Sequence, residues 1–164
     1  MEIRLMTKND DRLEISRIYE ESWKYAYKDI IPQSYLDSIP VGQWASGLDK
    51  DGRNTLLMFD GSRIIGTSSY CESRFPKFSG MGEIISIYIL PYYIGKGYGK
   101  QLLGSAIKNL GNSGYNEIFL WVLEANSPAR RFYEKFGFIE SGEFLNDNIG
   151  GKELKEIQYC YRIR

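Results

Sequence analysis

Three glycines, Gly95, Gly97 and Gly99, alternate at the point where an apolar run passes into an amphipathic one. Glycine lets the backbone approach a ligand closely and turn successive N–H groups into one concavity. A helix that begins at this point adds the partial positive charge of its N-terminus. The segment 91–100 is therefore suited to bind a phosphate or a pyrophosphate, and its two lysines would add charge at the rim.

The two common phosphate-binding motifs do not fit this segment. A Walker A loop needs a glycine at position 94 and a serine or threonine at position 101, where this chain has Ile94 and Gln101. A Rossmann fingerprint needs Gly-x-Gly-x-x-Gly, and no acidic strand end follows the turn at the right distance. Taken alone, the glycines fit a phosphate-binding turn and a tight packing turn about equally.

The composition restricts the groups that could act on such a ligand. The 164 residues include no histidine, which excludes histidine bases, Ser-His-Asp and Cys-His nucleophile systems and histidine-ligated metal sites. Cys71 and Cys160 lie far apart in the chain, which predicts two inert thiols in a reducing compartment. Proton transfer must fall to Asp, Glu, Tyr, Lys, Cys, a chain terminus or water.

Charge and length narrow the class of protein. Lys and Arg number 21 and Asp and Glu number 21, so no overall charge favours nucleic acid or an anionic membrane as a partner. The length predicts a single domain over residues 1–164. The N-terminus has no apolar signal segment, and no window is long enough to span a membrane. We therefore predict a cytoplasmic protein that binds neither nucleic acid nor a membrane.

The hydrophobic pattern predicts the elements that position the glycines, in the order β, α, α, β, β, β, α, β, α, β, β. Their expected ranges are 2–6, 11–25, 31–39, 54–60, 63–70, 82–90, 97–110, 118–123, 127–136, 138–144 and 156–162. The strand–helix–strand step over 82–123 implies a right-handed crossover between parallel strands of a mixed sheet.

Two longer motifs surround the glycine turn. Before it lies the run EIISIYILP at 83–91, and after it lies NSPARRFYEKFGF at 126–138. Together with the turn, they resemble the GCN5-related N-acetyltransferase (GNAT) family over residues 83–138. The resemblance implies a single-domain α/β (α+β) fold, in which a mixed sheet of about seven strands is flanked by about four helices.

The resemblance also implies the chemistry, a direct transfer of the acetyl group from acetyl-CoA to an amine without a covalent enzyme intermediate. No metal is expected. The resemblance assigns the thioester carbonyl and the pantetheine to a strand end, the pyrophosphate to the glycine turn, and a CoA amide to the following helix. In that order, the expected cofactor contacts are Tyr88, Ile89 and Leu90; Gly95, Lys96, Gly97, Tyr98, Gly99 and Lys100; and Asn126 and Tyr133. The family usually has Arg or Gln at position 94, and Ile94 removes that side-chain contact.

Two residues are candidates for proton transfer by family analogy. Tyr133 would act as the general acid that protonates the leaving thiolate, and Glu83 as the general base, directly or through water. Spacing alone leaves Tyr133 a core residue in an apolar stripe, Asn126 a helix cap and Glu83 a solvated carboxylate at a strand start. Glu72 and Cys71 are weaker candidates for the base.

The acceptor is expected near the N-terminal helices, where aromatic and acidic residues would bind a cationic amine. These residues are Trp23, Tyr25, Tyr27, Tyr35, Trp44, Glu20, Glu21, Asp29 and Asp37. The sequence predicts a small-molecule amine such as a polyamine, an amino acid or an antibiotic-like amine. A protein or peptide amine, or a non-catalytic acyl-CoA-binding module, are the alternatives. Homodimers are common in the family, and no residue here indicates one.

Overall fold

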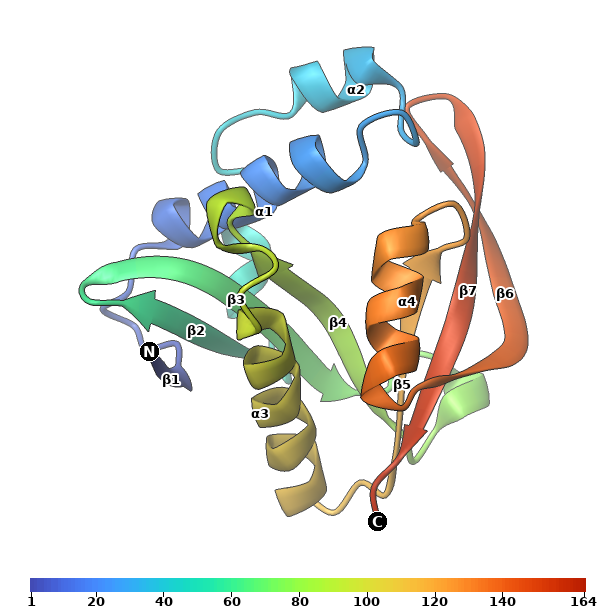
Figure 1. Ribbon diagram of the computed structural model, residues 1–164. Coiled ribbons are helices and arrows are strands. Elements are labelled where there is room, and N and C mark those ends of the chain that lie inside the picture. The colour runs from blue at the N-terminus through green and yellow to red at the C-terminus, as the bar shows by residue number, and fades with distance from the viewer.

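The computed structural model describes residues 1–164, and it contains one seven-stranded sheet in the order β1-β2-β3-β4-β5-β7-β6 (Figure 1). Strands β4 and β5 are parallel, and every other neighbouring pair is antiparallel. The strands are β1 (Glu2–Leu5), β2 (Asn54–Asp60), β3 (Arg63–Glu72), β4 (Gly82–Ile89), β5 (Glu117–Leu123), β6 (Ile139–Ile149) and β7 (Lys152–Arg162). The predicted mixed sheet, including its parallel step, is confirmed.

Four α-helices accompany the sheet, as predicted. They are α1 (Arg12–Ala26), α2 (Gln33–Ser38), α3 (Tyr98–Asn112) and α4 (Ser127–Phe136). Three 3₁₀ turns that the sequence pattern did not predict are η1 (Ser46–Asp49), η2 (Pro76–Phe78) and η3 (Pro91–Tyr93). None of the helices combines the length and the apolar character needed to cross a membrane.

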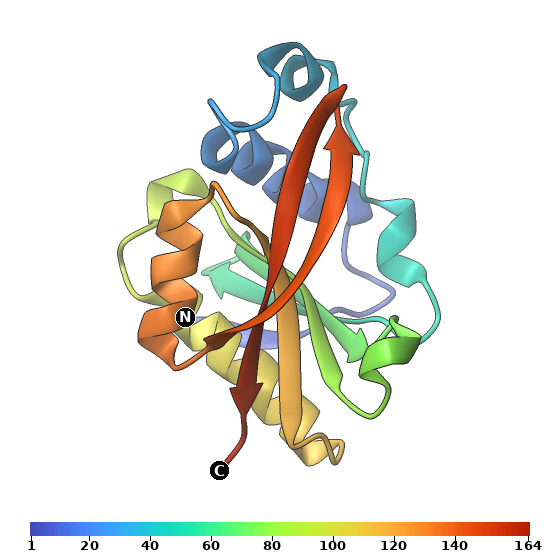
Figure 2. The ribbon, with the colours of Figure 1, turned by 90° about the vertical axis from the view of Figure 1, so that its right-hand side faces the viewer.

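Helices cover both faces of the sheet around β3 and β4. Tyr19 of α1 contacts Ser69 of β3 through their hydroxyls, 3.2 Å apart, whereas Leu102 of α3 lies against Gly66 of the same strand. Residues three apart in a strand point to opposite faces. Helices α1 and α3 therefore lie on opposite sides, and α4 stands beside the start of α3, where Phe132 approaches Gly99 (Figures 1 and 2).

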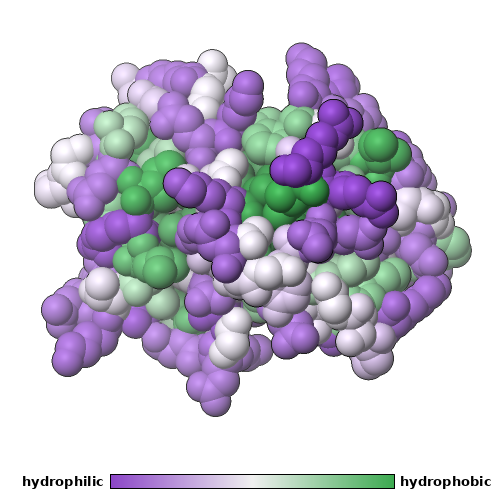
Figure 3. Space-filling model, turned by 90° about the horizontal axis from the view of Figure 1, so that it is seen from below, coloured by the Kyte–Doolittle hydropathy of each residue, from purple (hydrophilic) through white to green (hydrophobic).

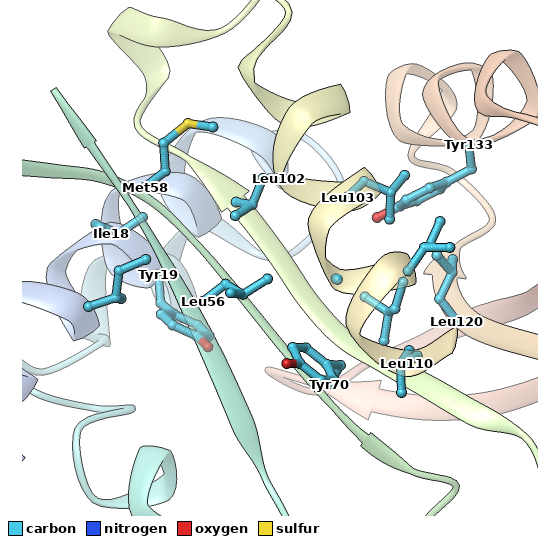
Figure 4. Close-up of a cluster of buried hydrophobic side chains, with 14 of the residues drawn as sticks. Ile18, Tyr19, Leu56, Met58, Tyr70, Leu102, Leu103, Leu110, Leu120 and Tyr133 are labelled. Atoms are coloured by element: carbon cyan, nitrogen blue, oxygen red, sulfur yellow. The ribbon is translucent and has the colours of Figure 1, made fainter. Parts of the chain in front are cut away.

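The main hydrophobic core comprises 25 buried residues from α1, α3, α4 and all the central strands (Figure 4). Helix α3 contributes the apolar positions that its helical spacing predicts, Leu102, Leu103, Ala106, Ile107 and Leu110. A smaller cluster beneath α2 joins Ile31 and Leu36 to Leu123 and Leu154. The face around the C-terminus is largely hydrophilic, with apolar side chains in separate patches (Figure 3).

The last hairpin is longer than the sequence pattern predicts, because β6 runs to Ile149 and β7 begins at Lys152. Its outer half is paired along its whole length, from Phe144 opposite Ile157 to the turn at Gly150-Gly151. Most side chains in this half are polar and exposed. Ladder hydrogen bonds rather than burial define these strands, so the hydrophobic pattern does not reveal them.

Strands β4 and β5 separate shortly after they meet, which opens the middle of the sheet. They pair only at Gly82 with Ile118 and at Glu83 with Phe119. Directly after this point, β4 carries a bulge at Ile85, where the register with β3 shifts by one residue. The two strands then diverge toward α1 (Figure 1), and their facing edges have no partner strand.

Candidate active site

A cleft of about 910 Å³ occupies the gap between β4 and β5. Its walls come from the end of α1, strand β4, the turn before α3, strand β5 and helix α4. The lining residues used below are Ser22, Tyr27, Ile87, Tyr88, Ile89, Ile94, Gly95, Gly97, Gly99, Lys100, Trp121, Asn126, Tyr133 and Glu156. The sequence motifs on either side of the glycine turn thus meet at one cavity.

The glycine turn forms one end of this cleft. The backbone N–H groups from Gly95 to Lys100 donate to no protein acceptor, and no side chain caps the N-terminus of α3. Gly95 and Gly97 have φ angles of 82° and 83°, which side-chain-bearing residues rarely adopt. Successive free amides at a helix N-terminus form an anion-binding cradle, as the sequence predicts.

The side chains around the turn differ in their positions. Ile94, Gly95, Gly97, Gly99 and Lys100 line the cleft. Lys96 instead places its ammonium 4.3 Å from the centroid of the Tyr92 ring. Tyr98 does not line the cleft, so it offers only its backbone N–H.

The edge of β4 gives the cleft further backbone groups. The N–H of Leu90 donates to the carbonyl of Ile65, and its carbonyl accepts from Tyr93, so Leu90 has no free backbone group and is 2% exposed. This removes Leu90 from the expected cofactor contacts. Because hydrogen-bonding direction alternates along a strand, the backbone groups of Ile87 and Ile89 face away from β3 and toward the cleft. Tyr88 lines the cleft with its side chain.

Tyr133 projects from α4 into both the core and the cleft. It is 9% exposed and packs near Phe138 and Tyr159, and Figure 4 shows it in the same cluster as Leu103. Its hydroxyl makes no hydrogen bond to the protein, although it lines the cleft. Burial, followed by the proximity of Tyr88, raises the pKa of Tyr133 well above its usual value. The phenol therefore keeps its proton at neutral pH and can donate it.

Asn126 has both of the roles that the sequence left open. It is the N-cap of α4, and its side-chain oxygen accepts from the N–H of Ala129 at 3.4 Å. It is also part of the cleft wall. Its amide nitrogen has no protein acceptor, so that group is free to donate to a ligand.

Glu83 does not line this cleft. It lies in a second cavity of about 220 Å³, where its side chain is fully buried. Arg74 donates to both carboxylate oxygens, at 2.6 Å from Nη2 to Oε1 and 3.1 Å from Nε to Oε2, and its backbone N–H also donates at 3.0 Å. With these donors in place, Glu83 is a paired structural carboxylate rather than a free proton acceptor.

Glu156 is the carboxylate that sequence reasoning missed. It lies on β7, directly opposite Leu123 of β5, and lines both the cleft and the second cavity. It is half-buried and forms neither an ion pair nor a side-chain hydrogen bond. Burial, followed by repulsion from Asp147, raises the pKa of Glu156, and Arg74 partly offsets this. A carboxylate with a raised pKa is a stronger base than an exposed one, so Glu156 is a candidate general base.

The structure brings only some of the expected acceptor residues to the two cavities. Trp23 and Tyr27 do line the second cavity, and Tyr25 lines the cleft. Trp44 instead packs between Tyr19 and Trp23.

The acidic residues expected beside them serve other purposes. Glu20 accepts hydrogen bonds from Ser16 and from the backbone of Gly42, and Glu21 pairs with Arg17. Neither these nor Tyr35, Asp29 and Asp37 line either cavity. The weaker base candidates Cys71 and Glu72 also lie outside both cavities, and burial raises the pKa of the Cys71 thiol.

Comparison with known proteins places this geometry in context. The model of the family described as Acetyltransferase (GNAT) family matches residues 13–138, which is most of the chain. The chain is 33% identical to the [ribosomal protein bS18]-alanine N-acetyltransferase of Haemophilus influenzae, over 72% of this chain and 82% of that protein. It is 29% identical to the spermidine N(1)-acetyltransferase of Thermoplasma acidophilum, over 92% of both.

A solved structure with the same fold is the PaiA N-acetyltransferase of Thermoplasma acidophilum, in complex with coenzyme A. It superposes with a TM-score of 0.71 at 24% identity, over 98% of this chain and all of that chain.

Proposed function

Because the chain belongs to the Acetyltransferase (GNAT) family, and is therefore an acyl-CoA-dependent N-acetyltransferase, we propose that it transfers the acetyl group of acetyl-CoA directly to the primary amine of a small molecule. One observation carries this proposal. The unpaired carboxylate of Glu156 lies where the two cavities meet, and the larger cavity ends at the free amides of the glycine turn. The donor and the acceptor would approach Glu156 from opposite sides.

The donor would bind mainly through the backbone. Its pyrophosphate fits the N–H groups from Gly95 to Lys100, with the Lys100 side chain at the rim. The pantetheine arm would follow the open edge of β4, where Ile87 and Ile89 face the cleft, and the free amide of Asn126 would bind one of its carbonyls. The coenzyme A bound by the Thermoplasma structure supports this choice of donor.

The reaction would proceed in one direct displacement. Glu156 accepts a proton from the acceptor ammonium, and the amine lone pair forms a C–N bond with the thioester carbonyl carbon. The negative charge that develops on the carbonyl oxygen is stabilised by an N–H group of the β4 edge. The C–S bond then breaks, Tyr133 donates its proton to the thiolate, and the acylated nitrogen loses its remaining extra proton to the Tyr133 phenolate, which restores the phenol. Glu156 then releases its proton to solvent. Glu156 takes the role that the sequence gave to Glu83, because Arg74 occupies the Glu83 carboxylate.

Other expectations remain proposals. One relative is named for the acetylation of spermidine and another for the acetylation of an alanine in a ribosomal protein. These names support an amine as the acceptor, but they do not distinguish a small-molecule amine from a protein amine. We propose that residues 1–164 act as one domain, since all seven strands share one sheet. A cytoplasmic location and a homodimer stay predictions.

The test is a thiol-release assay with acetyl-CoA and a panel of primary amines, alongside a peptide with a free N-terminus. Amine-dependent release of CoA by small molecules supports the proposal. Release only with the peptide favours a protein acceptor. Tight binding of acetyl-CoA, without release under any condition, would favour a non-catalytic acyl-CoA-binding module and refute the proposal.

A further inference from the structure

The second cavity, beyond Glu156, is small, and five of its 11 lining residues are aromatic. Eight of its 11 lining residues are hydrophobic, and its volume is about 220 Å³. Its residues are Trp23, Tyr27, Arg74, Phe75, Glu83, Ile84, Ile85, Tyr88, Trp121, Leu145 and Glu156. Tyr27, Ile85, Tyr88, Trp121 and Glu156 also line the cleft, so the two cavities adjoin. A group held in the smaller cavity would therefore face the end of the cleft that is far from the glycine turn.

The charges around both cavities leave one site for a cation. Glu83 and Glu156 are the carboxylates that line them, and Glu83 is bound by Arg74 through both oxygens. The remaining charged lining residues, Lys100 and Lys135, are positive. Among the lining residues, Glu156 is therefore the one carboxylate without a partner in the protein, and Asp147, whose charge also acts on Glu156, lines neither cavity.

On the premise of the function proposed above, we propose that the acceptor is a primary amine with one positive charge and a flat apolar body, rather than a polyamine. One ammonium matches the one unpaired carboxylate, Glu156. The body would pack among Trp23, Phe75 and Trp121, whose ring faces also attract a cation at the amine end. A second ammonium inside the cavity would lie near the Arg74 guanidinium, and no other lining carboxylate is free to balance it.

The size of the cavity agrees with this class of acceptor. A cavity of about 150 Å³ in another protein admits benzene. A volume of about 220 Å³ therefore admits one ring with a short amine-bearing chain. A polyamine is longer than one ring with a short chain, so part of it would have to lie outside this space.

An amino acid with a free carboxylate fits less well. Its carboxylate would lie close to its ammonium, and hence close to Glu156, which repels it. Arg74 already donates from Nε and Nη2 to Glu83, so its positive charge is balanced within the protein. The geometry thus favours a neutral body on the acceptor.

The first experiment compares matched acceptors with the wild-type protein in the thiol-release assay. The panel is 2-phenylethylamine, phenylalanine, 1,4-diaminobutane, spermidine and an alanine-initiated peptide. We expect kcat/KM for 2-phenylethylamine to exceed that for each of the others by at least about tenfold, a ratio within reach of one apolar pocket. A higher kcat/KM for the diamine, spermidine, the amino acid or the peptide overturns the proposal.

The second experiment changes the charge of the cavity. Leu145 lies on β6 directly opposite Glu156 and lines the cavity, so a carboxylate at this position would stand beside Glu156. Leu145→Glu should raise the kcat/KM ratio of 1,4-diaminobutane to 2-phenylethylamine by about tenfold over Leu145→Gln, which has the same shape without the charge. Comparing two acceptors with each variant cancels any common effect on Glu156. An unchanged ratio in folded Leu145→Glu contradicts the proposal.

A binding measurement separates this inference from the proposed function. Trp23 and Trp121 line the cavity, so their fluorescence reports acceptor binding without turnover. If no amine releases CoA, the proposed function fails, and the inference then depends on this titration. Tighter binding of 2-phenylethylamine than of 1,4-diaminobutane still supports the inference, whereas equal or weaker binding overturns it.

Discussion

Arg74 and Glu83 form the closest contact between opposite charges in the second cavity, at 2.6 Å from Nη2 to Oε1. The pair joins the loop after β3 to the second residue of β4. This residue lies immediately beside the point where β4 and β5 separate. The pair neutralises a fully buried carboxylate and leaves Glu156 as the unpaired one. The assignment of a structural and a chemical role to two neighbouring carboxylates follows from this contact.

Loss of the Arg74 guanidinium should destabilise the fold. Arg74→Met leaves the Glu83 carboxylate buried without a partner, which should lower the free energy of unfolding by about 3 kcal/mol and Tm by roughly 6 to 12 °C. Because the Arg74 side chain is 48% exposed, this estimate takes the lower end for a buried pair. Thermal unfolding followed by circular dichroism measures the change.

Two control variants accompany the measurement of Tm for Arg74→Met. Lys77→Met breaks the exposed pair with Glu143, which has a similar distance of 2.7 Å, and should cost less than about 1 kcal/mol. The double variant Arg74→Met/Glu83→Gln removes both charges and should regain part of the loss. Equal Tm values for Arg74→Met and Lys77→Met would contradict the structural role of the pair.

The acid limb of the rate profile should belong to Glu156. A general base acts in its deprotonated form, so kcat/KM should rise with pH through the pKa of Glu156, which burial raises. Glu156→Gln should lower kcat/KM by at least about a hundredfold and remove this limb. The exposed Glu153→Gln on the same strand is the control and should leave the profile as it was. An acid limb that persists in Glu156→Gln would assign the base elsewhere.

The hydroxyl of Tyr133 should matter for turnover rather than for binding. Tyr133→Phe keeps the ring in the core and removes only the proton donor, so kcat should fall at least about tenfold with a small change in KM. Tyr161→Phe is the control, because it removes the hydroxyl of another tyrosine whose ring packs on Phe136 and Phe138. It should leave kcat unchanged. Steady-state kinetics with saturating acceptor distinguish the two, and an unchanged kcat in Tyr133→Phe removes it from the mechanism.

Substitution by alanine should weaken CoA binding at Gly97, in the turn, but not at Gly104, within α3. Gly97→Ala places a side chain at a φ of 83°, so the turn must change shape, and the Kd for CoA should rise by about tenfold, from a strain of roughly 1–2 kcal/mol. Gly104→Ala lies within α3 with open space around it, so Kd should stay constant and the helix should gain up to about 1 kcal/mol. Calorimetric titration with CoA measures both. Equal affinities for the two variants would exclude the turn as the pyrophosphate site.

The features of the proposed donor side are local, so its backbone geometry could be expected from the sequence. The left-handed angles of Gly95 and Gly97 are accessible mainly to glycine, so the residue type itself indicates the turn. The end of α4 at Gly137 follows from the same kind of short-range rule, whereas its N-cap is Asn126 rather than Ser127, the residue that the Ser-Pro pair predicts.

The acceptor side depends on contacts between distant parts of the chain. Glu156 enters the site because β7 pairs with β5, and no neighbouring residue distinguishes it from the exposed carboxylates of the same strand. The bulge at Ile85, which opens the sheet, has no glycine or proline to indicate it. Glu83 was predicted as a base because its ion-pair partner, nine residues earlier in a loop, could not be recognised from spacing.

The free amides of the turn and the open edge of β4 affect how the sequence of such a protein can evolve. Main-chain groups persist when side chains are replaced, so the proposed donor site should tolerate many substitutions that preserve backbone shape. The acceptor cavity, in contrast, is built from side chains such as Trp23, Phe75 and Leu145. A few replacements there can alter which amine is accepted while the capacity to use the donor is inherited unchanged.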